Sequence, residues 1–167
     1  MKVIVTGGTG YLGSHTVLDL LKNNHDVLVI DNLYNSNENV VDLIQEISGK
    51  KIKFRRADLR DLGIIKSIFK KYKPDVVLHF AGLKSVEESI KKPESYYENN
   101  VVGTKNLLQA MDDFGCNKIV FTSSATVYGN PNHLPVDENH TLNPVNPYGV
   151  SKYLIEELIK KWTLSKR

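Results

Sequence analysis

Cysteine and long apolar segments are almost absent from this sequence of 167 residues. Its one cysteine, Cys116, excludes an internal disulfide framework and fits a reducing compartment, where a small buried hydrophobe is its simplest role. No apolar run approaches the roughly 18 residues of a membrane span, and the first run, Val3–Val5, is too short for the core of a secretion signal. These absences predict a cytoplasmic chain with no membrane partner.

An excess of charge of one sign is also missing. The 22 Lys and Arg residues nearly balance the 19 Asp and Glu residues, and the formal net charge is +3. So small an excess gives no reason to expect a nucleic-acid partner. The five His residues show no spacing typical of metal ligands, so no metal site is predicted. His79 lies inside an apolar run and is expected to be a hydrogen-bonded core residue.

Short apolar runs alternate with longer amphipathic segments along the whole chain. This alternation predicts βαβ units and therefore an α/β fold with a doubly wound parallel sheet. The strands are expected at Lys2–Thr6, Asp26–Ile30, Ile52–Arg55, Val76–Phe80 and Lys118–Thr122. The helices are expected at Leu12–Asn23, Asn39–Ile47, Asp61–Lys71, Pro93–Phe114 and Pro147–Trp162.

A glycine-rich turn follows the first predicted strand. Residues 7–13 read Gly-Gly-Thr-Gly-Tyr-Leu-Gly and satisfy both G-x-G-x-x-G and G-x-x-G-x-x-G. Glycine permits the tight turn and lets the backbone approach a pyrophosphate, while the next helix offers free N–H groups at its N-terminus. We therefore expect Gly7, Gly10 and Gly13 to form the phosphate loop of a Rossmann-type dinucleotide-binding domain that spans residues 1–167.

An acidic residue lies at the end of the second predicted strand. Asp31 is eighteen residues beyond Gly13, the distance at which a carboxylate accepts hydrogen bonds from the ribose hydroxyls of NAD and repels the extra phosphate of NADP. No Lys or Arg lies between Asp31 and Lys50 to receive that phosphate. The sequence therefore predicts NAD as the cofactor.

Two further polar residues follow predicted strands and have two interpretations each. Asp58 can reach an adenine amino group, or it can cap the helix that begins near Asp61. Lys84 follows Phe80, Ala81 and Gly82 and places one cation beside the expected pyrophosphate, or it is an exposed lysine at the start of a helix.

Three residues indicate chemistry rather than binding alone. Ser124 follows the fifth predicted strand at its carboxyl end, where open α/β sheets bind their ligands. Tyr148 and Lys152 are four residues apart at the start of the last predicted helix, so they share one helix face. An ammonium group held near a phenol favours the phenolate, which can then act as a base.

These residues resemble the extended short-chain dehydrogenase/reductase superfamily and, within it, the UDP-glucose 4-epimerase (UDP-galactose 4-epimerase) family. The resemblance extends from Met1 to about Trp162. The glycine loop and the Tyr-x-x-x-Lys pair are typical of the superfamily, while Phe-Ala-Gly-Leu-Lys and Ser-Ser-Ala-Thr-Val-Tyr-Gly are closer to the epimerases. The matching segments are residues 5–15, 31–33, 80–84, 97–100, 123–129 and 147–152.

The resemblance implies NAD that is regenerated in each turnover and the interconversion of UDP-galactose and UDP-glucose through a 4-keto sugar. Tyr148 then takes the proton from the sugar 4-hydroxyl, Ser124 hydrogen-bonds the same oxygen, and Lys152 favours the phenolate and holds the nicotinamide ribose. Thr126 is expected near the sugar. The other residues expected at the cofactor are Gly7, Gly10, Tyr11, Leu12, Gly13, Asp31, Asn32, Asn35, Ser36, Asp58, Leu59, Phe80, Ala81, Gly82, Lys84 and Asn99.

Members of this family are about twice as long, and their second half grips the UDP portion. We therefore expect this chain to be the N-terminal half, to be inactive alone, and to form a homodimer at full length through the helices at Pro93–Phe114 and Pro147–Trp162. Two alternatives stay open. One is a non-catalytic NAD-binding module. The other is a nucleotide-sugar 4,6-dehydratase, although such enzymes have an Asp-Glu pair where this chain has Ala125 and Thr126.

Overall fold

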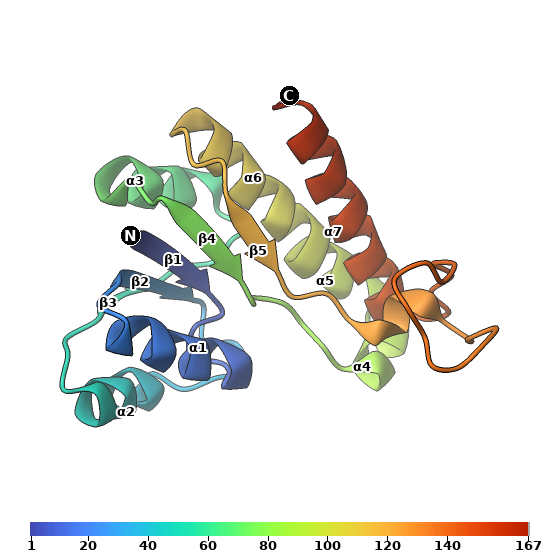
Figure 1. The fold of residues 1–167 in the computed structure, drawn as a ribbon, viewed down its shortest axis with the longest axis horizontal. Helices are drawn as coiled ribbons and strands as arrows, with labels where there is room; N and C mark the ends of the chain where they lie inside the picture. Colours follow the sequence, from blue (N-terminus) through green and yellow to red (C-terminus); the bar gives the residue numbers. More distant parts are fainter. Residues whose placement is uncertain (167) are drawn as a thin grey trace. The chain divides into compact units, whose positions relative to one another are not determined.

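A computed structural model describes residues 1–166 of the chain as an alternation of strands and helices (Figure 1). Contacts divide the chain into two compact units, Met1–Ala81 with Gln109–Thr122, and Gly82–Leu108 with Ser123–Arg167. The strands are β1 (Lys2–Thr6), β2 (Asp26–Asp31), β3 (Lys53–Arg56), β4 (Val76–His79) and β5 (Ile119–Phe121). The α-helices are α1 (Tyr11–Lys22), α2 (Asn39–Ser48), α3 (Leu62–Tyr72), α4 (Val86–Lys91), α5 (Pro93–Tyr96), α6 (Gly103–Asp113) and α7 (Pro147–Leu164).

The first unit contains a five-stranded parallel sheet with the order β3-β2-β1-β4-β5. Strand order reverses between β1, which pairs with β2 on one side, and β4, which pairs with β1 on the other. Helices α1 and α2 lie on one face of this sheet and α3 lies on the opposite face (Figure 1). This arrangement confirms the predicted doubly wound fold, in which ligands bind where the strand order reverses.

Side chains along β1 point alternately to the two faces of the sheet, so the core of this unit has a part on each face. Val3 and Val5 pack in one cluster with Val17 and Leu21 of α1, all of them almost fully buried. Ile4 points to the other face, where α3 contributes the buried side chains of Ile65, Phe69 and Tyr72. The Tyr72 hydroxyl donates a hydrogen bond of 2.7 Å to the carbonyl oxygen of Asp26, which fastens α3 to the start of β2. Both faces of the central strands are therefore covered.

The second unit is helical and is organised around α7. The side chain of Asn146 caps α7 by accepting a hydrogen bond of 2.8 Å from the N–H of Gly149. Helices α4 and α5, a π-helix η1 (Tyr97–Val102) and a 3-10 helix η2 (Ala125–Tyr128) all pack against α7. Leu83, Tyr96 and Tyr148 form a buried cluster in this unit. The first turns of α7 are thereby fixed by their neighbours.

Some element predictions were wrong. The single helix expected over Pro93–Phe114 is divided into α5, the π-helix and α6, because a π-turn widens the helix and interrupts its hydrogen-bond pattern. Helix α4 was implied only by one interpretation of Lys84, and the 3-10 helix was not expected, since each is too short to show a helical period. The third strand is a polar edge strand in which Phe54 alone is half-buried, and it begins one residue later than expected. Other boundaries agree within two residues.

Among the described residues, none of the helices combines the length and the apolar character needed to cross a membrane.

Candidate functional site

The glycine turn lies where the strand order reverses. Gly7 adopts φ +70°, a conformation that other residues rarely accept, and a Cβ on it would lie 2.5 Å from the backbone nitrogen of Ala81 after β4. A Cβ on Gly13 would lie 2.2 Å from the carbonyl oxygen of Gly7. Gly7 is therefore required where the turn packs against the segment after β4. Gly13 is required where α1 packs against the turn. Phe80 and Ala81, two predicted site residues, border this turn.

Gly10 differs from these two glycines because little protein packs against it. A Cβ on Gly10 would meet only the carbonyl oxygen of Gly7, at 3.2 Å. Gly10 is also the N-cap of α1, it provides no side-chain cap, and the next residues, Tyr11 and Leu12, are exposed. An open backbone surface at an uncapped helix N-terminus fits a phosphate group well.

Asp31 is buried at the end of β2, and several donors hold its carboxylate. One oxygen accepts from the N–H of Leu33 at 2.9 Å and from the hydroxyl of Ser36 at 3.2 Å, and the other accepts from the N–H of Thr9 at 3.2 Å. A carboxylate has about four acceptor positions, so three are already used. Asp31 therefore joins the glycine turn to the segment after β2, and about one of its acceptor positions stays free.

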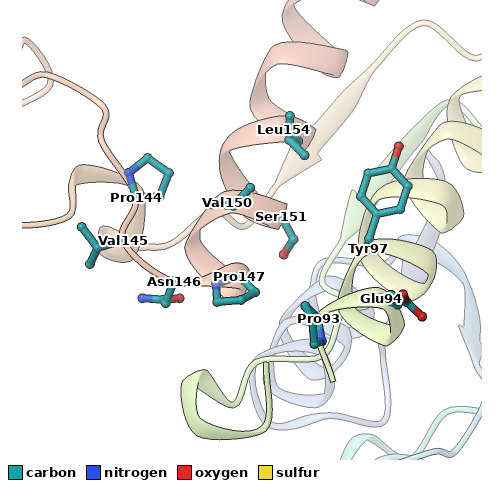
Figure 2. Close-up of a pocket in the computed structure, with 10 residues that line it drawn as sticks. All are labelled: Pro93, Glu94, Tyr97, Pro144, Val145, Asn146, Pro147, Val150, Ser151 and Leu154. Carbon is teal, nitrogen blue, oxygen red and sulfur yellow. The ribbon is translucent and has the colours of Figure 1, made fainter. Parts of the chain in front are cut away.

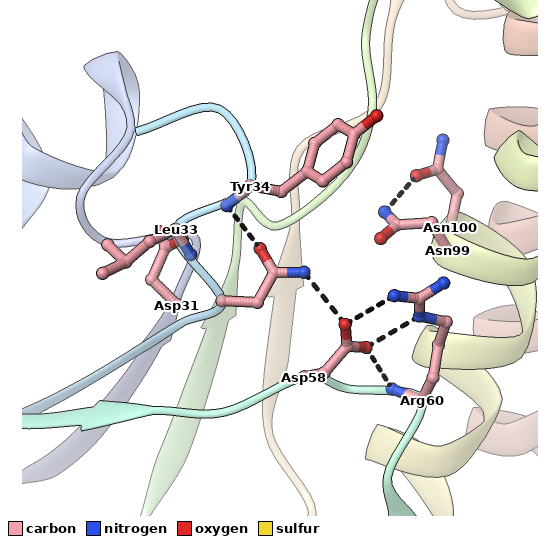
Figure 3. A network of polar contacts seen from close by, with 8 residues as sticks. Asp31, Leu33, Tyr34, Asp58, Arg60, Asn99 and Asn100 are labelled. Carbon is pink, nitrogen blue, oxygen red and sulfur yellow. Dashed lines mark hydrogen bonds and ion pairs between the residues drawn. The ribbon is translucent and has the colours of Figure 1, made fainter. Parts of the chain in front are cut away.

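A polar network around Asp58 and Arg60 lies beside Asp31 (Figure 3). Asn32 donates to Asp58 at 3.0 Å, and Arg60 donates through its guanidinium at 2.7 and 2.9 Å and through its backbone N–H. The hydrogen bonds from Arg60 hold the pKa of Asp58 well below its usual range. The cap of α3 is Asp61, whose side chain accepts from the N–H of Ile64, so the alternative that Asp58 caps this helix is wrong.

The remaining predicted site residues of the first unit lie near these groups in sequence and differ in exposure. Ser36 contacts the hydroxyl of Thr9 at 2.8 Å, Asn35 is exposed, and Leu59 is buried. His79 is almost fully buried and its ring Nδ1 lies 2.6 Å from the hydroxyl of Thr6, which confirms that it is a hydrogen-bonded core residue.

In the second unit, Ser124 and Thr126 come together at the start of the 3-10 helix. Ser124 is the N-cap, and its hydroxyl accepts from the N–H of Thr126 at 3.3 Å and from the Thr126 hydroxyl at 2.9 Å. The first turn of α7 lies against this segment, because a Cβ on Gly149 would lie 2.8 Å from the carbonyl oxygen of Thr126. Two hydroxyl groups are thereby placed beside the turn that carries Tyr148.

Tyr148 and Lys152 are both buried in the first two turns of α7, with 9% and 6% of their surfaces exposed. The ring of Tyr148 packs edge-on against Tyr96 at a centroid distance of 6.4 Å. Burial lowers the pKa of Lys152 to about 8, while the negative charge of Glu156 acts in the opposite direction. A lysine this deeply buried has a cost in stability, which favours a functional role.

Asn100 is a residue of this region that the sequence analysis did not single out. Its side chain accepts from the N–H of Leu83 at 2.8 Å and donates to the carbonyl of Leu83 at 3.0 Å and to the hydroxyl of Ser151 at 3.1 Å. A Cβ on Gly82 would lie 3.3 Å from its side-chain oxygen and 3.7 Å from Nζ of Lys152. A buried Asn within an apolar helical pattern is the signal that could have identified it.

Asn99 and Lys84, both expected at the cofactor, also lie in the second unit. Asn99 donates from its side chain to that of Asn100 at 2.9 Å (Figure 3). Lys84 is exposed and directly precedes Ser85, the N-cap of α4. This position agrees with the interpretation of Lys84 as an exposed lysine at the start of a helix. Its exposure leaves the ammonium group accessible to an anion.

A mostly apolar pocket of about 610 Å³ also belongs to the second unit (Figure 2). It is separate from the predicted site residues, none of which lines it. Its lining comes from the helices at residues 93–97, the segment before α7 and the first turns of α7, and includes Pro93, Glu94, Tyr97, Pro144, Val145, Asn146, Pro147, Val150, Ser151 and Leu154.

Comparison with known proteins agrees with these features. A family model described as GDP-mannose 4,6 dehydratase matches residues 4–167. The UDP-glucose 4-epimerase of Homo sapiens is 49% identical over 166 residues, which cover 95% of this chain and 48% of that protein. The UDP-glucose 4-epimerase of Bacillus subtilis is 45% identical, and the match covers 96% of this chain and 47% of that protein. The chain spans about half the length of the curated relatives it matches.

Solved structures give the same result. A UDP-glucose 4-epimerase from Stenotrophomonas maltophila with bound NAD and formylated UDP-arabinopyranose has a TM-score of 0.96 and 42% identity, covering all of this chain and 50% of that one. A UDP-glucose 4-epimerase from Bifidobacterium longum in complex with NAD+ and UDP has a TM-score of 0.96 and 40% identity. The match covers 99% of this chain and 50% of that one. These matches confirm the resemblance inferred from the motifs.

Proposed function

Because the chain belongs to the GDP-mannose 4,6 dehydratase family, we propose that it is the NAD-binding and catalytic half of a UDP-glucose 4-epimerase. The buried Tyr148–Lys152 pair on α7 is the observation that carries this proposal. A buried lysine one helical turn after a buried tyrosine has little value for stability, whereas it favours a phenolate that acts as a base. The named relatives, which are all UDP-glucose 4-epimerases in the comparisons above, support the substrate assignment.

The first unit fits NAD as the cofactor. The backbone at Gly10 and the N-terminus of α1 would hold the pyrophosphate, and Asp31 the adenosine ribose. Asp58 would accept from the adenine amino group in place of one of the four hydrogen bonds that its carboxylate accepts from Asn32 and Arg60. Asn32, Asn35, Ser36 and Leu59 complete the surroundings proposed for the adenosine. The carboxylate of Asp31 favours NAD over NADP because it repels a 2′-phosphate. Held by these residues, NAD would supply reversible hydride transfer at C4 of the sugar.

The second unit supplies the groups proposed for proton transfer and for the nicotinamide portion. Tyr148 takes the proton from the sugar 4-hydroxyl and returns it in the reverse half of the reaction. Ser124 donates a hydrogen bond to the same oxygen, and Thr126, whose hydroxyl lies 2.9 Å from that of Ser124, contacts the sugar. Lys152 favours the phenolate and holds the nicotinamide ribose, together with Gly82, Lys84 and Asn99.

Two other functions are less well supported. A dehydratase requires an acid and a base to remove water, but Ala125 and Thr126 stand where such enzymes have their Asp-Glu pair, and neither side chain transfers a proton at neutral pH. A module that only binds NAD has no use for a buried lysine beside a buried tyrosine. Epimerisation accounts for both observations.

An assay of UDP-glucose formation from UDP-galactose with added NAD tests the proposal. We expect a chimera to be active when residues 1–167 replace the matching half of the human relative. The chain alone should show no turnover, because in the family it resembles the second half binds UDP and so positions the sugar. Tyr148→Phe in the chimera should lower turnover about 10²–10⁴-fold, the usual contribution of a general base.

Tyr153→Phe is the matched control, since Tyr153 also lies on α7 but is not proposed to contact substrate. It should leave turnover within about threefold of the unmodified chimera, a difference of less than about 1 kcal/mol in the barrier. Near-normal turnover of the Tyr148→Phe chimera would show that another group is the base.

The surface around the apolar pocket supports a homodimer at full length. Tyr97 and Val150 border the pocket with about half and 40% of their surfaces exposed, and they lie on the helical segments that we expect at the interface. Exposed apolar side chains gathered around a hollow are typical of interfaces between proteins. We therefore assign this surface to contact with a second copy of the chain.

A further inference from the structure

A serine and a glutamate outside the proposed catalytic group connect its two parts. Glu156 lies on α7 four residues after Lys152, and Ser123 directly precedes Ser124. The hydroxyl of Ser123 donates a hydrogen bond to the carboxylate of Glu156. The segment that carries Ser124 is therefore fastened to the helix that carries Tyr148 and Lys152.

The negative charge of the same carboxylate also acts on Lys152. Residues four apart on a helix face the same side, so the Glu156 carboxylate lies on the face that carries the Lys152 ammonium group. Burial lowers the pKa of Lys152, and the charge of Glu156 is what raises it. Without that charge, a larger share of Lys152 would be neutral near pH 8.

We propose that Glu156, anchored by Ser123, is a positioning residue that keeps Lys152 in the ammonium form and keeps Ser124 beside the first turns of α7. This inference rests on the role proposed above for Lys152. It adds a residue one helical turn beyond the Tyr-x-x-x-Lys pair and a serine one position before Ser124, neither of which is proposed to touch substrate or cofactor.

Neighbouring charges do not account for this coupling. The next residue, Glu157, pairs with Lys160 at 3.8 Å. Glu88 of α4 pairs with Lys92 at 3.5 Å and accepts a hydrogen bond from the hydroxyl of Tyr96. The other titratable groups on the elements that pack against α7 are Glu87 and Lys91, which pair with each other, and Glu94, Tyr97, Glu98 and Tyr128. The two causes that move the pKa of Lys152 are its burial and Glu156.

An NMR titration of lysine side chains in the 167-residue chain tests the charge coupling without any assay of activity. Lys152→Met identifies the Lys152 signal by its loss. In Glu156→Gln, the titration midpoint of Lys152 should fall by about half a pH unit or more, the effect of removing one charge at this spacing. The control Glu157→Gln removes an equal charge one residue further along and should leave the midpoint unchanged.

Ser123→Ala provides a second test that retains the charge. Once the anchor is lost, Glu156 can turn to solvent, so the Lys152 midpoint should fall by a smaller amount than in Glu156→Gln. In the active chimera, Glu156→Gln and Ser123→Ala should also lower the pH at which turnover declines on the alkaline side. A change in folding alone would not shift this pH.

An unchanged Lys152 midpoint in both Glu156→Gln and Ser123→Ala would overturn the inference, as would an equal shift in Glu157→Gln. If the midpoint shifts as expected while the chimera has no turnover, the proposed function fails and the Glu156–Lys152 coupling stands.

Discussion

At the scale of single residues, Lys152 is the clearest case of a side chain whose burial lowers the stability of the fold. Because burial lowers its pKa from the ordinary 10.5 to about 8, the folded chain binds fewer protons than the unfolded chain between these two values. The free energy of unfolding should therefore rise as pH increases from about 8 to 10.5, and the full penalty should be present below pH 8. That penalty is on the order of 3 kcal/mol, since each pKa unit corresponds to about 1.4 kcal/mol.

Lys152→Met should consequently stabilise the chain at pH 7, by up to about 3 kcal/mol. The gain should decline as the pH approaches 10.5, where the native lysine loses its charge in the unfolded chain as well. Urea denaturation of both proteins at pH 7 and pH 10 measures this difference. Lys161→Met, at an exposed position of the same helix, should change the free energy of unfolding by no more than about 0.5 kcal/mol. A large loss of stability in Lys152→Met at pH 7 would contradict this account.

Tyr148, Lys152 and Ser124 could be predicted from the sequence because their spacing and their place after a strand or at a helix start carry chemical meaning. Asn100, Glu156 and Ser123 were not predicted. The hydrogen bonds from Asn100 to Ser151 and from Ser123 to Glu156 join segments that are far apart in the chain, and no local spacing indicates such contacts.

At the scale of elements, Gly7, Gly10 and Gly13 of the glycine turn have different packing. A Cβ on Gly13 would strike a backbone oxygen at 2.2 Å, whereas a Cβ on Gly10 would meet the same oxygen at only 3.2 Å. Gly13→Ala should therefore lower the free energy of unfolding by about 1–3 kcal/mol or more, the usual effect of overpacking against a rigid group. Gly10→Ala should retain most of the stability but weaken NAD binding about tenfold or more, because the methyl group occupies the space of a phosphate.

Thermal unfolding and calorimetric titration with NAD separate these two effects. If Gly10→Ala bound NAD as tightly as the native chain, the phosphate would not lie against Gly10. Equal stability of Gly13→Ala and the native chain would show that α1 can move away from the turn.

Helices and strands were predicted correctly where their apolar pattern extends over many residues, and they were missed where that pattern is short. The strands β1, β2 and β4 and the helices α1, α2, α3 and α7 were expected within two residues because their apolar patterns extend over most of their length. The π-helix was not expected, because the residues 97–102 continue an ordinary helical pattern, and only the hydrogen bonds of the folded chain distinguish the two forms.

At the scale of the whole molecule, the proposed homodimer depends on a surface that the sequence indicated only through resemblance. Tyr97→Glu would place a charge at the rim of the apolar pocket and should convert the active chimera from dimer to monomer. Light scattering during gel filtration measures the mass directly. Leu43→Glu is the matched control, because Leu43 is equally exposed but lies on α2 of the first unit, and it should leave the mass unchanged. A dimer that survives Tyr97→Glu would place the interface elsewhere.

The central claim is that this chain is built to bind NAD through its glycine turn and Asp31. Calorimetric titration of the 167-residue chain with NAD and with NADP tests it most directly, with Asp31→Ala as the comparison. NAD should bind at least about tenfold more tightly than NADP, and Asp31→Ala should weaken NAD binding and narrow this ratio, because the carboxylate both binds the ribose and repels a 2′-phosphate. Equal affinity of the native chain for the two dinucleotides, or an unchanged ratio in Asp31→Ala, would contradict the account.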